Sequence, residues 1–205
     1  MGKFFKSKNT EKNYGADLPE DTLLAFRAAD GDEKAFEELV KKYERFVSTC
    51  IYPVLGNSED VLDVSQEVFL KTYRSLSTFK GESGFSTWLY RIAKNCAYDF
   101  LRKKRGDTVS LDETDEDGKS MDLADTDEKN SPEKCIEKQE RREIVWKAIS
   151  RLSDEHREVV VLRDINGLTY EQISDITGLE PGTVKSRLFR AREALKKQLC
   201  AENYF

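Results

Sequence analysis

The sequence has few of the residues that build metal sites, redox pairs or multi-histidine catalytic centres. Its 205 residues include one histidine, His156, and four cysteines, with no Cys-x-x-Cys pair among them. One histidine leaves little for acid–base catalysis, and the scattered cysteines indicate neither a zinc knuckle nor a redox pair, so reduced thiols are expected. We therefore expect no catalytic residue, no metal site and no cofactor.

Long hydrophobic runs are missing as well. No apolar stretch approaches the roughly 18 residues of a membrane span, and the first residues contain no apolar core of a signal peptide. Hydrophobic residues make up 38% and charged residues 36% of the chain, a composition typical of a soluble, helix-rich protein. We expect no membrane insertion and a cytoplasmic location.

Acidic residues are concentrated in one segment. The formal net charge is −5, but residues 107–138 alone hold twelve acidic residues and four lysines, a net charge of −8. Few apolar residues and several Gly, Ser and Pro indicate a linker, either a plain solvated spacer or a functional acidic segment. We expect four parts: a flexible N-terminal tail (1–18), a helical domain (19–105), an acidic linker (106–135) and a second helical domain (136–202).

Residues 168–192 have the pattern of a helix-turn-helix. Thr169 and Gln172 have the spacing of a capping box, which starts a helix. Gly178 can adopt the backbone geometry that ends this helix, and Pro181 suits the first turn of the next one. The pattern predicts a short helix followed by a recognition helix.

The predicted recognition helix has one apolar face and one basic face. Helical spacing places Val184, Leu188, Ala191, Leu195 and Leu199 together, with Ser186, Phe189, Arg190, Glu193 and Lys197 roughly opposite. Residues 185–197 hold six basic residues and one acidic residue, a net charge of +5. Such a helix suits a phosphate-lined DNA groove. The alternative is a solvated basic helix in an ordinary bundle.

An acidic ridge is predicted in the first domain, where the spacing is helical throughout. Phe36, Leu39 and Tyr43 lie on an apolar stripe, and residues 58–71 bury a second stripe of valines. The other side of that second helix carries Asp60, Asp63, Gln66 and Glu67. Carboxylates at this spacing can also hold a metal or act as acid and base, but no histidine, phosphate loop or second carboxylate cluster supports that reading. A basic protein partner fits the ridge better.

Residues 86–105 form the third predicted helix, which is basic outside its core face. This segment has a net charge of +5, and its outer face presents Arg91, Asn95, Tyr98 and Arg102. Tyrosine and arginine on a basic surface are suited to stacking on unpaired bases while holding the backbone. Trp88 and Tyr90 could instead fill the edge of the core.

Three motifs together resemble the extracytoplasmic-function (ECF) group of bacterial RNA polymerase sigma factors. They are Asp-Val-Ser-Gln-Glu-Val-Phe at 63–69, Phe-Ser-Thr-Trp-Leu-Tyr-Arg-Ile-Ala-Lys-Asn at 85–95 and Gly-Thr-Val-Lys-Ser-Arg at 182–187. The resemblance covers about residues 20–105 and 136–200. It implies an all-α fold of two small helical domains joined by a flexible acidic linker, with a region 2-like first domain and a region 4-like second domain that contains the helix-turn-helix.

The resemblance also implies function and partners. A sigma factor of this group binds core RNA polymerase, through the β′ clamp helices and the β subunit, and directs promoter recognition, promoter opening and transcription initiation. Promoter DNA and an anti-sigma protein are the other implied partners. The acidic linker resembles the segment that threads the polymerase toward the RNA path. A stand-alone DNA-binding regulator and a metal-dependent nuclease are the alternatives from other classes.

Residue roles follow position by position from the same resemblance. The implied polymerase-binding residues are Asp60, Asp63, Gln66 and Glu67. The implied contacts to the minus-ten element are Glu82, Ser83 and Phe85 in a base-capturing loop, and Trp88, Tyr90, Arg91, Asn95, Tyr98 and Arg102 on the helix after it. The implied contacts to the minus-thirty-five element are Thr183, Lys185, Ser186, Arg187, Phe189, Arg190 and Lys197. Trp88-Leu89 stands where primary sigma factors carry two tryptophans, so strong autonomous melting is not expected.

Overall fold

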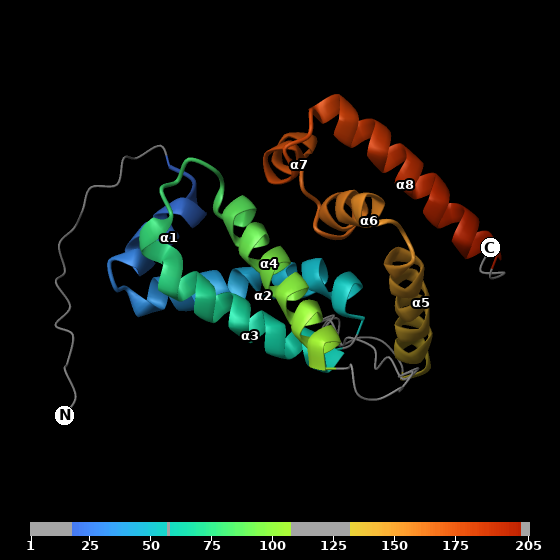
Figure 1. The fold of residues 1–205 in the computed structure, drawn as a ribbon, viewed down its shortest axis with the longest axis horizontal. Coiled ribbons are helices and arrows are strands. Elements are labelled where there is room, and N and C mark those ends of the chain that lie inside the picture. The colour runs from blue at the N-terminus through green and yellow to red at the C-terminus, as the bar shows by residue number, and fades with distance from the viewer. Residues whose placement is uncertain (1–17, 57, 108–131, 202–205) are drawn as a thin grey trace.

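The structure is a computed structural model that describes residues 18–56, 58–107 and 132–201, and this part of the chain is helical without strands (Figure 1). The elements before the linker are α1 (Glu20–Ala29), α2 (Glu33–Leu55), α3 (Ser58–Ser75), the 3-10 turn η1 (Leu76–Thr78) and α4 (Phe85–Asp107). The elements after it are α5 (Pro132–Ser150), α6 (Asp154–Val160), the π-helical turn η2 (Val161–Ile165), α7 (Tyr170–Thr177) and α8 (Pro181–Ala201). The predicted all-α class is confirmed.

Three helix ends differ from those expected. Helices α4 and α5 extend into both ends of the predicted linker, to Asp107 and from Pro132. Helix α4 also starts at Phe85, one position before the serine expected to cap it, because the N–H groups of Thr87 and Trp88 donate to the carbonyl of Gly84 at 3.0 and 3.2 Å. The expected N-terminal tail and the acidic centre of the linker lie outside the described residues.

Helix α2 is the central element of the first domain and packs against α1, α3 and α4. The Asp32 carboxylate caps its start by accepting from the N–H groups of Lys34 and Ala35 at 3.1 and 3.2 Å. At its end Gly56 adopts φ +73°, the left-handed geometry that favours glycine. The capped helix buries its predicted stripe against the valine face of α3 and the inner face of α4; the fully buried side chains include Leu39, Val47, Val64, Val68 and Leu89.

The second domain contains the predicted helix-turn-helix. Thr169 and Gln172 form both halves of the capping box, with the Gln172 N–H 3.2 Å from Thr169 Oγ1 and the Thr169 N–H 2.8 Å from Gln172 Oε1. Gly178 ends α7 with φ +72°, and Pro181 begins α8. Val184, Leu188 and Ala191 are buried, as the apolar stripe predicts.

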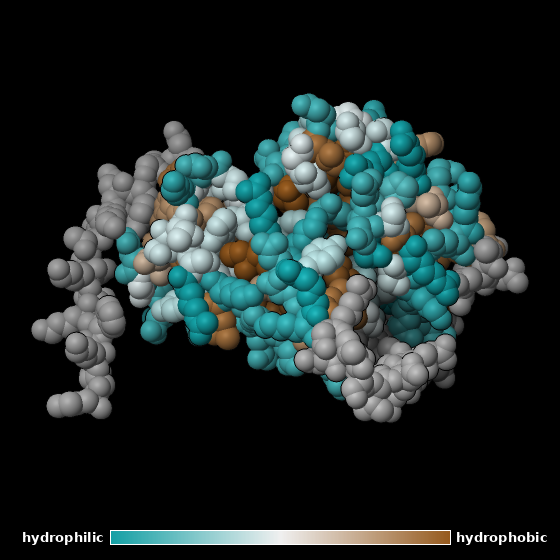
Figure 2. Space-filling view, in the orientation of Figure 1, coloured by the Kyte–Doolittle hydropathy of each residue, from teal (hydrophilic) through white to brown (hydrophobic). Residues whose placement is uncertain are grey.

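The two helical groups pack against each other. Helix α4 packs against α7 and reaches α6 through side-chain hydrogen bonds, and α2 packs against α5 and η2. Helix α8 runs along the outer side of the second group (Figure 1). The face shown in Figure 2 is mainly hydrophilic over both groups, with hydrophobic side chains visible in separate small patches. In the described ranges, no helix is both long and apolar enough to cross a membrane.

Candidate polymerase and nucleic-acid interfaces

The acidic ridge on α3 is only partly available to a partner. Asp63 and Gln66 are exposed. Glu67 is half-buried and pairs with Lys71 at 3.0 Å. Asp60, which the sequence grouped with the ridge, lies 3.0 Å from Lys104 of α4, and its side chain is only 18% exposed. The accessible part of the ridge is therefore centred on Asp63, Gln66 and Glu67.

Apolar side chains accompany the ridge, and the sequence reasoning did not identify them as functional. Leu62, Leu70 and Tyr73 are 62%, 57% and 47% exposed on α3. Their spacing places them along one side of this helix, next to Gln66. A helical pattern can reveal such residues, because they fall outside the buried face that contains Val61, Val64 and Val68. Large apolar side chains beside accessible polar ones are typical of a protein–protein interface.

The loop before α4 is fixed at both ends by buried rings. Phe79 is 6% and Phe85 2% exposed, and their ring centroids lie 5.7 Å apart. Gly81 between them has φ +73°, and a Cβ atom there would lie 3.0 Å from the Phe26 ring of α1. The glycine thus allows both the turn and the close approach to α1. Between these anchors, the loop presents exposed Glu82 and half-buried Ser83.

Phe85 does not have the exposed position expected of a minus-ten contact. Its ring lies in the core, with centroids 5.2 Å from Tyr43 and 5.9 Å from Trp88. Because α4 starts at Phe85, this side chain joins the core as the helix begins, and in this structure it anchors the loop. Trp88 packs against the same cluster and stays partly exposed, so it does fill the core edge.

The outer face of α4 divides into an open part and a covered part. Arg91, Asn95 and Arg102 are exposed. Tyr90 is only 7% exposed and Tyr98 is half-buried, and the hydroxyls of both reach carboxylates of α6. Lys94 lies between these tyrosines, and the sequence reasoning omitted it, although its helical spacing from Arg91 and Tyr98 places it on the same face.

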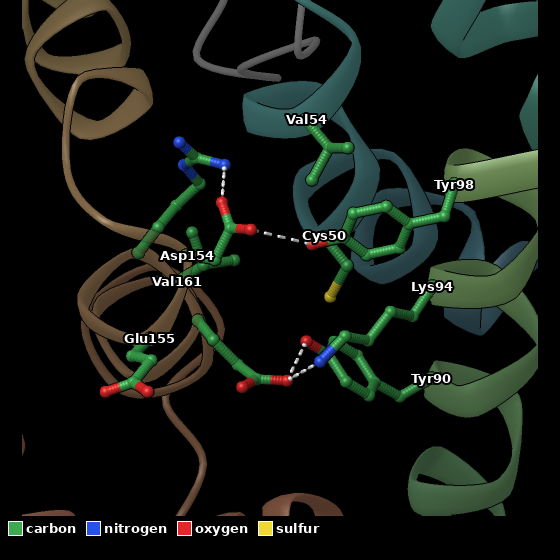
Figure 3. Close-up of a pocket in the computed structure, with 10 residues that line it drawn as sticks. Cys50, Val54, Tyr90, Lys94, Tyr98, Asp154, Glu155 and Val161 are labelled. Carbon is green, nitrogen blue, oxygen red and sulfur yellow. Dashed lines mark hydrogen bonds and ion pairs between the residues drawn. The ribbon is translucent and has the colours of Figure 1, made fainter. Parts of the chain in front are cut away.

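A carboxylate of α6 makes the polar contacts at the covered part. Figure 3 shows Tyr90, Lys94 and Tyr98 pointing from α4 toward α6. The Tyr90 hydroxyl and the Lys94 ammonium each donate to Glu158 Oε1 at 2.7 Å. Burial, together with the adjacent Glu158 carboxylate, raises the pKa of Tyr90 well above its usual range, so the phenol stays protonated and donates.

Helix α8 presents its basic face to the surface. The exposed residues on it include Thr183, Lys185, Ser186, Arg190 and Lys197, and Phe189 is 68% exposed. Arg187 differs from the other predicted contacts because it is half-buried and lies 3.3 Å from Glu155 of α6. Arg192 forms a two-bond ion pair with Asp164 of η2, one bond being 3.0 Å from Nε to Oδ2. These two arginines attach the recognition helix to its own domain.

No group of three His, Cys, Asp or Glu side chains within the described ranges is placed to hold a metal ion. The site therefore consists of three surfaces: the ridge on α3, the face of α4 with its preceding loop, and the basic face of α8. The exposed apolar and acidic groups of the ridge are of the kind found at protein–protein interfaces, and the basic groups of the other two surfaces are of the kind that contact nucleic acid.

Both helical domains match known protein families. The family models Sigma-70 region 2 and Sigma-70, region 4 match residues 39–106 and 142–195. The chain is 39% identical over 185 residues to the ECF RNA polymerase sigma-E factor of Escherichia coli (strain K12), covering 87% of this chain and 94% of that protein. It is 38% identical over 184 residues to the RNA polymerase sigma-H factor of Pseudomonas aeruginosa, covering 88% and 94%.

Solved structures show the same fold. CnrH in complex with the cytosolic domain of CnrY matches with a TM-score of 0.64 at 25% identity, covering 88% of this chain and 97% of that one. RpoE of Bartonella quintana in complex with the anti-sigma factor NepR matches with a TM-score of 0.58 at 23% identity, covering 81% and 97%.

The fold and the comparisons define a two-domain transcription initiation factor that binds RNA polymerase and promoter DNA. The chain belongs to the ECF RNA polymerase sigma factors. It accordingly directs promoter recognition and transcription initiation by core RNA polymerase.

Proposed function

We propose that this sigma factor binds the β′ clamp helices of core polymerase through Asp63, Gln66 and Glu67 of α3. The observation that carries this assignment is the accessible acidic ridge with exposed Leu62 and Leu70 beside it. Acidic groups would select and orient a basic surface, while the leucines would supply apolar contact area. Asp60 contributes by holding α4 against α3 through Lys104.

The face of α4 and the loop before it form the proposed minus-ten surface. Asn95, with Glu82 and Ser83 of the loop, would hold a base that has left the stack. Arg91 and Arg102 would hold the single-stranded backbone. The buried Phe79 and Phe85 anchors keep the loop in place, which limits the ordering that binding would otherwise require. Tyr90 and Tyr98 can join this surface only when α6 moves away.

Helix α8 would enter the major groove of the minus-thirty-five element. Ser186, Phe189 and Arg190 are exposed near its N-terminal end, where recognition helices contact base edges. Lys185 and Lys197 would hold phosphates and set the salt dependence. Arg187 would have to leave Glu155 to reach a phosphate, so its contribution is expected to be smaller than that of Lys185.

The proposed role involves no covalent chemistry by this chain, which acts by placing polymerase on a promoter. It would work in the cytoplasm, where polymerase and DNA are found. An anti-sigma protein is the proposed regulator, by extension from the Bartonella relative solved in such a complex.

Gel shifts on one promoter fragment test this function. We expect core polymerase and this chain together to form a heparin-resistant complex that neither forms alone. A specific complex of the chain alone, unchanged by core polymerase, would instead indicate a stand-alone regulator.

The proposed ridge is tested by reversing its charges. A variant with Glu37→Lys and Glu38→Lys, which reverses two exposed charges on α2 away from the ridge, is the matched control for the ridge variants.

A further inference from the structure

We infer that the acidic face of α6 occupies the DNA-binding face of α4 in the free protein, so that α6 and the minus-ten strand compete for one surface. The inference rests on the proposed minus-ten role of α4. It names a regulatory contact within this chain, with Glu158 as its centre.

The contacts join donors on α4 to oxygen acceptors on the second domain. Tyr90 and Lys94 donate to Glu158 at 2.7 Å, and the Tyr98 hydroxyl lies 3.4 Å from Asp154 Oδ2. Arg91 lies 3.4 Å from the carbonyl oxygen of Asp175 in α7. Aromatic hydroxyls and cations on this face are the groups that would hold phosphate oxygens and unstacked bases. The carboxylates of α6 thus take the position of the negatively charged ligand.

Glu158 is the main polar connection between the domains. Its side chain is 15% exposed, compared with 43% for Lys94 and 70% for Glu155 on the same helix. Glu158 accepts one hydrogen bond from a phenol and one from an ammonium group. A largely buried carboxylate with both partners contributes more to holding the two domains together than an exposed ion pair does. Replacing it by a cation would leave the buried Tyr90 hydroxyl opposite a donor and place two like charges together.

Contacts without charge complete the junction. The Tyr52 and Trp146 rings meet edge to face, with centroids 5.2 Å apart, and Thr49 Oγ1 lies 2.8 Å from Asn166 Oδ1. However, the junction contains a partly open cavity of about 250 Å³, lined by Cys50 and Val54 of α2 and by tyrosines and charged groups of α4 and α6 (Figure 3). Part of the junction between α4 and α6 is therefore not closely packed, as is common between two domains of one chain that can move relative to each other.

The test uses the full chain without polymerase, in two measurements. Small-angle X-ray scattering reports whether the domains are together, and fluorescence anisotropy reports binding of a single-stranded minus-ten oligonucleotide. We expect Glu158→Lys to increase the radius of gyration and to tighten oligonucleotide binding about fivefold or more. Glu193→Lys, the same charge change at an exposed position of α8 that does not line the junction, should leave the domains together.

A charge exchange separates loss of the contact from loss of folding. Adding Lys94→Glu to Glu158→Lys should restore the compact form in scattering, and circular dichroism should show unchanged helix content in all variants. If Glu158→Lys stays as compact as wild type and binds the oligonucleotide equally well, the Glu158 contact neither holds the domains together nor blocks α4, and the inference is overturned.

Two further outcomes separate a failure of the proposed competition from a failure of the proposed minus-ten role of α4. Expansion without tighter binding, while Asn95→Ala still weakens binding, would overturn competition and leave the minus-ten role of α4 intact. If Asn95→Ala had no effect on oligonucleotide binding in the Glu158→Lys background, both the minus-ten role and the competition would be wrong.

Discussion

Lys104 of α4 lies 3.0 Å from Asp60 at the start of α3. Asp60, an acidic residue on the same helix as the ridge, therefore forms an ion pair within the protein. The ion pair joins the helix proposed for polymerase binding to the helix proposed for the minus-ten element. It leaves Asp63, Gln66 and Glu67 as the part of the ridge that a partner can reach. The predictions for polymerase binding therefore concern these residues.

Reversing the charges of Asp63 and Glu67 should abolish binding to core polymerase. Like charges would then face a basic surface, which costs several kcal/mol at an interface. Asp63 is exposed, where charge changes usually alter folding stability by only about 0.5 kcal/mol, and the Glu67–Lys71 contact is a surface ion pair worth about 0 to 1 kcal/mol, so the helical fold should remain. Pull-down of core polymerase by Asp63→Lys/Glu67→Lys measures the effect, with Glu37→Lys/Glu38→Lys as the control. Capture at the wild-type level by the ridge variant would rule out this docking surface.

Arg190→Ala should relax promoter choice at one base pair of the minus-thirty-five element. Loss of a base-edge contact costs about 1 to 3 kcal/mol for the matched sequence and little for a mismatched one. Lys197→Ala should weaken all sequences alike and reduce the salt dependence. Binding of matched and mutated duplexes over a salt series separates these roles. Equal losses on both duplexes for Arg190→Ala would mean that this arginine does not read a base.

Asn95→Ala should slow promoter opening and leave recruitment through the minus-thirty-five element unchanged. Flipping a base out of the duplex costs a few kcal/mol, which contacts around the flipped base must offset. A promoter with a preformed mismatch at the minus-ten element should therefore rescue the variant. Permanganate footprinting on both templates follows the opened strand. Opening of the fully paired promoter at the wild-type rate would show that Asn95 takes no part in melting.

Thr169→Ala should destabilise the second domain by about 1 kcal/mol, because it removes the capping box at the start of α7. DNA binding should weaken only as far as the unfolded population increases. Circular dichroism of the full chain during heating measures the loss of stability as a lower melting temperature. Thr169→Ser, which retains the hydroxyl, should melt close to wild type; an equal loss in both variants would assign the effect to packing of the threonine methyl group.

The sequence predicted the features that depend on neighbouring residues. The capping box at Thr169, the turn at Gly178 and the start of α8 at Pro181 are local, and all three were predicted correctly. The buried stripes of α2 and α3 follow from helical spacing in the same way.

Features that depend on distant contacts were not predicted. The sequence left open that Tyr90 fills the core edge, but Tyr90 and Glu158 are 68 positions apart, so periodicity within α4 could not show that Tyr90 meets α6. Asp60 and Lys104 are 44 positions apart, so helical spacing alone included Asp60 in the accessible ridge. The burial of Phe85 depends on the ring cluster that α1, α2 and the loop form together.

The most direct test of the central claim is in vitro transcription from genomic DNA by core polymerase, with and without this chain, with all 5′ ends mapped. The account predicts a discrete set of new start sites that share minus-ten and minus-thirty-five elements, appear only when the chain is added, and disappear with Asp63→Lys/Glu67→Lys. Start sites that are unchanged by the chain, or new sites that persist with the ridge variant, would contradict it.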